Sequence, residues 1–169
     1  DLSQALSRYY QIDRGTLGNE TDILNDYRVV IIADPQEPFS EKDKYILDQY
    51  LMQGGRILWV VNGVRFSDEY LSQSGMTPVI PLELQIDDML FRYGVRVNAT
   101  LVQDLQCLPV PVDVSSDPQQ PNWQPMPWTF APLLLTSQVS PITRNVAQVT
   151  ATMASAIDIV GEDYAYDIH

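Results

Sequence analysis

The chain has 169 residues, of which 45% are hydrophobic and 19% charged, a composition typical of one globular domain with a buried core. Its formal net charge of −12, with ten basic residues scattered along the sequence, argues against nucleic acid or an anionic membrane surface as a partner. No stretch approaches the roughly 18–20 consecutive apolar residues that span a bilayer. We therefore expect any membrane association to come from segments outside this chain.

The first predicted elements are a short helix over residues 2–10 and a strand over residues 28–33. The strand sequence, Arg-Val-Val-Ile-Ile-Ala, is a continuous β-branched run. Such runs are typical of strands that are buried on both faces of a parallel sheet. Asp34-Pro35 ends the strand, because proline has no N–H to donate to a sheet.

A helix and a second strand follow and complete a predicted βαβ unit. Ser40 to Asp43 has the form of a capping box, and apolar residues then recur at helical spacing up to Gly54-Gly55. Residues 56–61 (Arg-Ile-Leu-Trp-Val-Val) are predicted to form a second buried strand. A strand, helix and strand in this order favour parallel α/β architecture with a right-handed crossover.

The next predicted elements are a helix that begins at Pro81 and ends at Gly94, and short strands over residues 95–98 and 101–103. Residues 105–132 contain seven prolines, a density that predicts a long excursion with little regular helix or central strand. Its aromatic residues argue against simple disorder, so we expect it to pack on the domain or on a partner. Residues 146–160 predict one or two strands, followed by an acidic end.

The residues that catalysis or metal binding would need are largely missing. The only histidine is His169, at the end of the chain, and Cys107 lies in a proline-rich segment without a signature for a nucleophile. No phosphate-binding or dinucleotide-binding glycine motif is present. Asp87-Asp88 and the cluster of Glu162, Asp163 and Asp167 are interpreted as solvated surface. We therefore predict a noncatalytic chain with no metal and no cofactor.

Two sets of residues are candidates for binding. Asp34, Asn62 and Arg65 follow the two predicted parallel strands, and ligands of open parallel sheets bind beyond the carboxyl ends of the strands. The turn-forming tendencies of Asp-Pro and Asn-Gly explain the same residues without a ligand, and this interpretation is favoured. The aromatic residues of the proline-rich segment suit contact with a partner, and equally suit core packing. They are Trp123, Trp128 and Phe130.

Long colinear stretches also carry a family resemblance. They include residues 25–35 (Asn-Asp-Tyr-Arg-Val-Val-Ile-Ile-Ala-Asp-Pro), residues 45–59, residues 88–98 and Ser140-Pro-Ile-Thr-Arg-Asn145. The chain resembles the gliding motility-associated ABC transporter auxiliary proteins of the GldG type over nearly its whole length. The resemblance implies a substrate-binding-like, membrane-anchored protein of bacteria of the Bacteroidetes type.

The resemblance also implies a fold, a location and partners. The implied fold is one α/β domain over residues 1–169, a parallel flavodoxin-like or class I glutamine amidotransferase-like sandwich with the proline-rich excursion at residues 105–132. The implied location is the periplasmic side of the cytoplasmic membrane, and the implied partners are an ABC permease, its ATPase and other envelope proteins. Amidotransferase chemistry is not expected, because Cys107 and His169 do not occupy the positions it requires.

Three functions therefore remain open from the sequence. The first is a noncatalytic auxiliary domain that acts by docking to proteins. The second is a receptor for a small solute, such as a sugar or a peptide fragment, at the strand ends. The third and least favoured is a hydrolase or amidotransferase.

Overall fold

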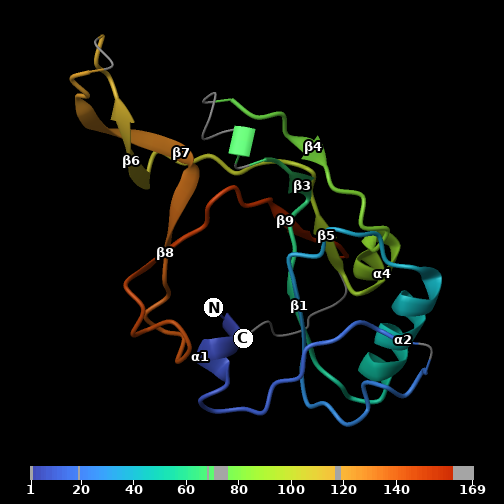
Figure 1. Ribbon diagram of the computed structural model, residues 1–169. Helices are drawn as coiled ribbons and strands as arrows, with labels where there is room; N and C mark the ends of the chain where they lie inside the picture. The colour runs from blue at the N-terminus through green and yellow to red at the C-terminus, as the bar shows by residue number, and fades with distance from the viewer. Residues whose placement is uncertain (1, 19, 68, 71–75, 117–118, 162–169) are drawn as a thin grey trace. The chain divides into compact units, whose positions relative to one another are not determined.

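The computed structural model describes residues 2–18, 20–67, 69–70, 76–116 and 119–161. The chain divides into two compact units (Figure 1). Unit 1 comprises residues 1–32 and 39–59, and unit 2 comprises residues 33–38 and 60–169. That the whole chain forms a single domain stays a prediction. The elements are α1 (Leu2–Leu6), β1 (Val30–Ala33), α2 (Glu41–Met52), β2 (Ile57–Val60), β3 (Val64–Arg65), β4 (Ile80–Pro81), α4 (Asp87–Arg92), β5 (Val95–Val97), β6 (Cys107–Asp113), β7 (Trp123–Leu135), β8 (Gln148–Thr150) and β9 (Ile157–Ile159).

The predicted βαβ unit is present as β1, α2 and β2, and lies mostly in unit 1. The capping box is confirmed: the Ser40 side chain accepts a hydrogen bond from the Asp43 N–H, and the Asp43 carboxylate accepts one from the Ser40 N–H. Two bonds, from Val30 N–H to Arg56 O and from Asp34 N–H to Val60 O, advance along both strands in the same direction. This is the pattern of a parallel pair.

The buried part of unit 1 centres on helix α2. Ile46 and Leu47 are fully buried, and the Tyr50 hydroxyl donates a 3.0 Å hydrogen bond to the Tyr27 carbonyl oxygen. This bond ties the helix to the segment that enters β1. The two strands are not buried on both faces as predicted, since Ile31 is 39% and Leu58 50% exposed.

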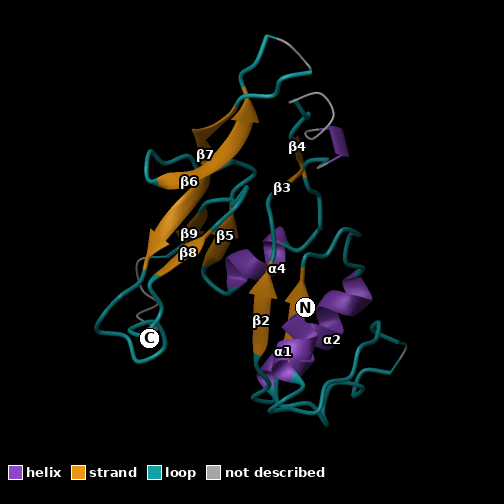
Figure 2. Cartoon of the chain, turned by 60° about the vertical axis from the view of Figure 1, so that its left-hand side comes forward, coloured by secondary structure: helices purple, strands orange, loops and turns teal. Residues whose placement is uncertain are grey.

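The expected parallel flavodoxin-like or class I glutamine amidotransferase-like sandwich is wrong. Among the described residues the sheets are small, with strand orders β1-β2, β3-β4, β5-β9 and β6-β7-β8, and the last three are antiparallel. Figure 2 shows β6 and β7 lying side by side as the strands of one hairpin. Three residues separate β2 from β3, whereas a parallel crossover needs a dozen or more, so β3 cannot directly extend the parallel pair of β1 and β2.

The proline-rich segment 105–132 is not an irregular excursion, which corrects the prediction. It forms most of an antiparallel hairpin of β6 and β7, in which Pro109 pairs with Pro127 and Pro111 pairs with Pro125. Hydrogen-bonded and non-hydrogen-bonded pairs alternate along an antiparallel ladder, and the bond from Val114 N–H to Asn122 O identifies that pair as hydrogen-bonded. The proline pairs are therefore non-hydrogen-bonded pairs, in which an N–H would point away from the partner strand. Proline therefore costs the hairpin no hydrogen bond at these four positions.

Other element boundaries also differ from the predictions. The helix expected from Pro81 begins only at Asp87, because residues 80–81 pair with β3. Gly94, with φ of 82°, ends that helix as predicted. Residues 101–103 are not a strand, whereas residues 146–160 contain β8 and β9 as expected. Within the described residues, no helix combines the length and the apolar character needed to cross a bilayer.

Candidate functional site

The three residues predicted at the strand ends come together in one pocket. Asp34 follows β1, Asn62 follows β2, and Arg65 is the last residue of β3. All three belong to unit 2. They line a pocket of about 230 Å³, which we call the strand-end pocket. Its lining residues are Asp34, Gln36, Asn62, Val64, Arg65 and Phe66.

The Asp34 side of the pocket is held by hydrogen bonds. The Asp34 N–H donates to the Val60 carbonyl oxygen at 2.8 Å, which continues the β1–β2 ladder. The residue adopts φ of 50°, a left-handed conformation that Asp tolerates better than most residues. Its Oδ1 accepts a 2.9 Å hydrogen bond from the Gln36 side-chain amide. One carboxylate oxygen is thus fixed by a neighbour that the sequence prediction missed.

The backbone between Asn62 and Val64, both of which line the pocket, is held through Gly63. Its N–H donates to the Ser155 hydroxyl at 2.9 Å, and its carbonyl oxygen accepts from the Leu82 N–H at 3.0 Å. A Cβ at Gly63 would lie 2.8 Å from the Asn98 carbonyl carbon and closer still to its oxygen. Only glycine fits this close backbone approach, which fixes the chain between Asn62 and Arg65.

Strand β3 determines where Arg65 points. Arg65 pairs with Ile80 of β4, and the preceding Val64 is buried. Since side chains alternate along a strand, burial of Val64 leaves Arg65 on the exposed face. Among the described residues, no ion pair or hydrogen bond joins the Arg65 side chain to Asp34 or to any other group. The strand-end pocket therefore holds two opposite charges that do not neutralise each other directly.

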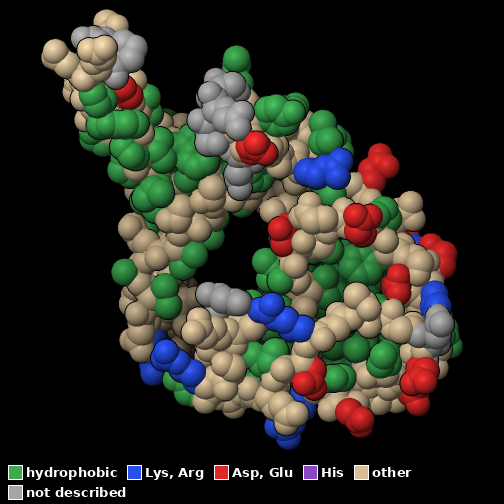
Figure 3. All heavy atoms as spheres, in the orientation of Figure 1, with side chains coloured by type: hydrophobic (Ala, Val, Ile, Leu, Met, Phe, Trp, Pro, Cys, Tyr) green, Lys and Arg blue, Asp and Glu red, His purple; other side chains and the backbone are tan. Residues whose placement is uncertain are grey.

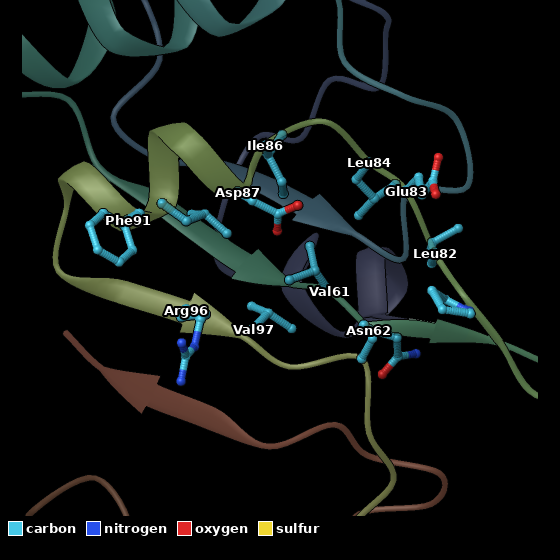
Figure 4. Close-up of a pocket in the computed structure, with 14 residues that line it drawn as sticks. Val61, Asn62, Leu82, Glu83, Leu84, Ile86, Asp87, Phe91, Arg96 and Val97 are labelled. Carbon is cyan, nitrogen blue, oxygen red and sulfur yellow. The ribbon is translucent and has the colours of Figure 1, made fainter.

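A second pocket, of about 260 Å³, shares Asn62 with the first. Figure 4 shows Val61 and Val97 on one side of it and Ile86 on the other, with Asp87 directed between them. This pocket is mainly apolar, and the sequence prediction missed it because its lining residues come from three separate segments of unit 2. The alternation of Leu82, Leu84 and Ile86 was the available signal.

Arg96, which lines this second pocket, is already paired with an acidic residue. Arg96 of β5 contacts Asp158 of β9 at 2.7 Å, and the Asn98 side-chain amide donates to the same carboxylate at 2.9 Å. The hydrogen bond from Arg96, followed by that from Asn98, holds the pKa of Asp158 below its usual value. This cluster joins the two strands of a sheet, and we interpret it as structural.

The three aromatic residues that were predicted to contact a partner lie at different points along one strand of the hairpin. Trp123, at the start of β7, is 62% exposed, whereas Trp128 and Phe130 are half-buried. Trp128 lies five residues farther along the strand, about 16 Å at the usual rise. The Phe130 carbonyl oxygen accepts a bond from the N–H of buried Met153. Trp123 thus belongs to the exposed part of the hairpin, and Phe130 contributes to its base.

Both faces of the exposed part of the hairpin carry exposed apolar side chains, and one of the two carries the prolines. Trp123 shares one face with the prolines of the ladder, since all of them occupy alternate, paired positions. We call this set the proline face. Figure 3 shows hydrophobic side chains gathered over β6 and β7. The members of the proline face are Pro109, Pro111, Trp123, Pro125 and Pro127, and every one is exposed. Exposed Asp113, which pairs with Trp123, lies on the same face and is its one charged residue.

Among the described residues, those considered for catalysis or metal binding do not form a cluster. Cys107 is a half-buried free thiol in β6, opposite Pro132. Across the described residues, no group of three or more His, Cys, Asp and Glu side chains has the arrangement of a metal site. His169 and the cluster of Glu162, Asp163 and Asp167 lie outside the described residues.

Comparison with known proteins gives the family and a neighbour in fold. None of the curated proteins matches the chain. Among solved structures, the chain is similar to the N-terminal domain of mmIFT52, with 18% identity and a TM-score of 0.60 over 95% of this chain and 64% of that one. At this identity the likeness shows the fold alone, and it replaces the flavodoxin and amidotransferase analogy. A family model described as "ABC-type uncharacterized transport system" matches residues 1–167, so the chain belongs to this family of auxiliary components of ABC transport systems.

Proposed function

We propose that this chain is a noncatalytic, extracytoplasmic auxiliary domain that docks to the permease of its ABC transport system through the proline face. Family membership supports the association with an ABC system. The observation that carries the docking mechanism is the exposed hairpin, in which one of the two tryptophans, Trp123, is 62% exposed. An exposed aromatic residue within an apolar patch is the typical anchor of a protein interface.

The chemistry of the hairpin supports a protein partner that binds its face rather than its edge. Pro109, Pro111, Pro125 and Pro127 remove the outward N–H groups that another strand would need for pairing. Asp113 is the single charged residue within β6 and β7. A nearly uncharged face suits an apolar protein surface better than a charged one.

The choice of the permease follows from the proposed location. A chain on the periplasmic side meets the permease directly, whereas the ATPase binds on the cytoplasmic side and would associate only through the permease. The acidic chain, with a net charge of −12, has little electrostatic attraction to an anionic membrane, which favours docking to protein over docking to lipid.

Photo-crosslinking in the membrane-anchored, full-length protein tests the proposal. A photo-reactive residue at position 123 is expected to crosslink to the permease, and Trp123→Ala is expected to reduce permease recovery at least ten-fold with an unchanged melting temperature. Val139→Ala is the matched control, because Val139 is 92% exposed in the same unit and outside the hairpin. Equal recovery from the Trp123→Ala variant would rule out docking through this face.

We also propose that the transport system is of the GldG type and serves gliding motility. The colinear resemblance of residues 25–35, 45–59 and 88–98 supports this finer assignment. Deletion of the encoding gene in its own host is expected to abolish spreading on agar, with rescue by the intact gene. Normal spreading of the deletion strain would separate this protein from motility while leaving its family membership unaffected.

The noncatalytic role is part of the same proposal. Cys107 lies within a β-strand, paired opposite Pro132, rather than on the tight strand-to-helix turn that presents a nucleophile. An amidase or transferase activity that disappears in the Cys107→Ser variant would contradict it.

A further inference from the structure

We propose that the strand-end pocket binds a small zwitterion, an amino acid or the free ends of a short peptide, with its ammonium group at Asp34 and its carboxylate at Arg65. The proposal rests on two opposite charges that line one pocket of about 230 Å³ in unit 2. It is independent of the docking proposed for the hairpin, which involves other residues.

The two charges line the same pocket and are not paired with each other. Within the described part of the chain, neither Arg65 nor Asp34 takes part in a salt bridge. Oδ1 of Asp34 accepts from Gln36, and among the described groups Oδ2 accepts no hydrogen bond. One carboxylate oxygen and the guanidinium fork thus remain for a ligand. Charge-assisted hydrogen bonds to both are the strong type.

The same two charges discriminate against other small solutes. A simple anion attracted to Arg65 is repelled by Asp34, and a simple cation is repelled by Arg65. A neutral sugar would leave both charged groups without an ionic partner, which loses the main advantage of the site. Only a compound with both charges uses both groups.

The size of the pocket and its neutral groups fit this ligand class. A volume of about 230 Å³ lies below the roughly 300–1,000 Å³ of pockets for drug-sized ligands. The side chain of Asn62 has no hydrogen-bond partner among the described residues and offers both a donor and an acceptor. Phe66 adds an apolar wall for the ligand's carbon atoms.

The Asp34 side of the pocket is also held in place before any ligand binds. The Gln36 side-chain amide holds Oδ1 of Asp34, the bond from the Asp34 N–H to Val60 holds its backbone, and Gly63 anchors the backbone beside Asn62. Groups that are fixed in advance lose less entropy on binding.

The test is an NMR titration of the whole chain with L-alanine and L-alanyl-L-alanine. We expect the side-chain amide signals of Asn62 and Gln36 to shift, with binding at least ten-fold weaker for N-acetyl-L-alanine, which lacks the ammonium, and for L-alaninamide, which lacks the carboxylate. D-Glucose serves as the neutral comparison and is expected to cause no shift.

Two variants test which charged group of the ligand is bound by Asp34 and which by Arg65. Asp34→Asn is expected to abolish the preference for L-alanine over N-acetyl-L-alanine, and Arg65→Gln the preference over L-alaninamide. Arg92→Gln is the matched control, since Arg92 is an exposed arginine outside the pocket. Equal binding of blocked and free compounds, binding of glucose instead, or no shift with any zwitterion in a folded sample would each overturn the proposal.

Discussion

Replacing Gly63 with alanine is the sharpest test of how unit 2 is held together beside the strand-end pocket. The φ angle of Gly63 is not in the left-handed region, so the effect of a side chain is steric rather than conformational. The new Cβ would lie 2.8 Å from the Asn98 carbonyl carbon and 3.2 Å from the Ala99 Cα, and both are backbone atoms. Backbone cannot swing away as a side chain can, so the two segments must separate.

The magnitude follows from overpacking and from lost hydrogen bonds. Overpacking of this kind typically costs about 1–3 kcal/mol. Separation also weakens the bonds of Gly63 with Ser155 and Leu82, at about 0.5–1.5 kcal/mol each. Because the two effects overlap, we expect a loss of about 2–4 kcal/mol, equivalent to roughly 4–16 °C in melting temperature for a chain of this length.

Urea denaturation followed by circular dichroism measures this loss as a lower midpoint at an unchanged slope. Gly15→Ala is the matched control, because a Cβ there meets nothing within 4 Å, and it should change stability by less than about 1 kcal/mol. An unchanged midpoint for Gly63→Ala would show that the close approach of the Asn98 backbone does not exist in solution.

Three further predictions concern other parts of the chain. Ser40→Ala removes the cap of α2 and is expected to lower the free energy of unfolding by about 1 kcal/mol in urea denaturation. Because the folded-state pKa of Asp158 is lowered, its contribution to the free energy of unfolding is present above the unfolded pKa of about 3.9 and is lost as pH falls further. Asp158→Asn should therefore flatten the acid side of a curve of stability against pH, and an unaltered curve would contradict this. The double variant Pro125→Thr and Pro127→Thr restores N–H groups on a free edge of the hairpin, so light scattering should detect concentration-dependent association that the parent chain lacks.

The amino-acid sequence was sufficient for the local elements with strong, short-range signals. The capping box at Ser40, the glycine stop at Gly94 and the strands on either side of α2 were predicted, because each depends on residues within a few positions of one another. Asp34 and Asn62 follow the parallel strands β1 and β2, whose carboxyl ends lie at one edge, whereas Arg65 lies in antiparallel β3; all three line the strand-end pocket, although the sequence alone favoured interpreting them as turn residues. Whether that pocket binds a ligand stays a prediction.

Only the tertiary structure decided how strands after β2 pair and what the prolines do. Pairing partners such as β5 and β9 are about 60 residues apart, and no local pattern specifies such a choice. A high proline count predicts irregular structure, yet Pro109 and Pro111 lie opposite Pro127 and Pro125, where the ladder needs no N–H. That outcome depends on the register of two strands, which is a property of the folded hairpin and not of either segment alone.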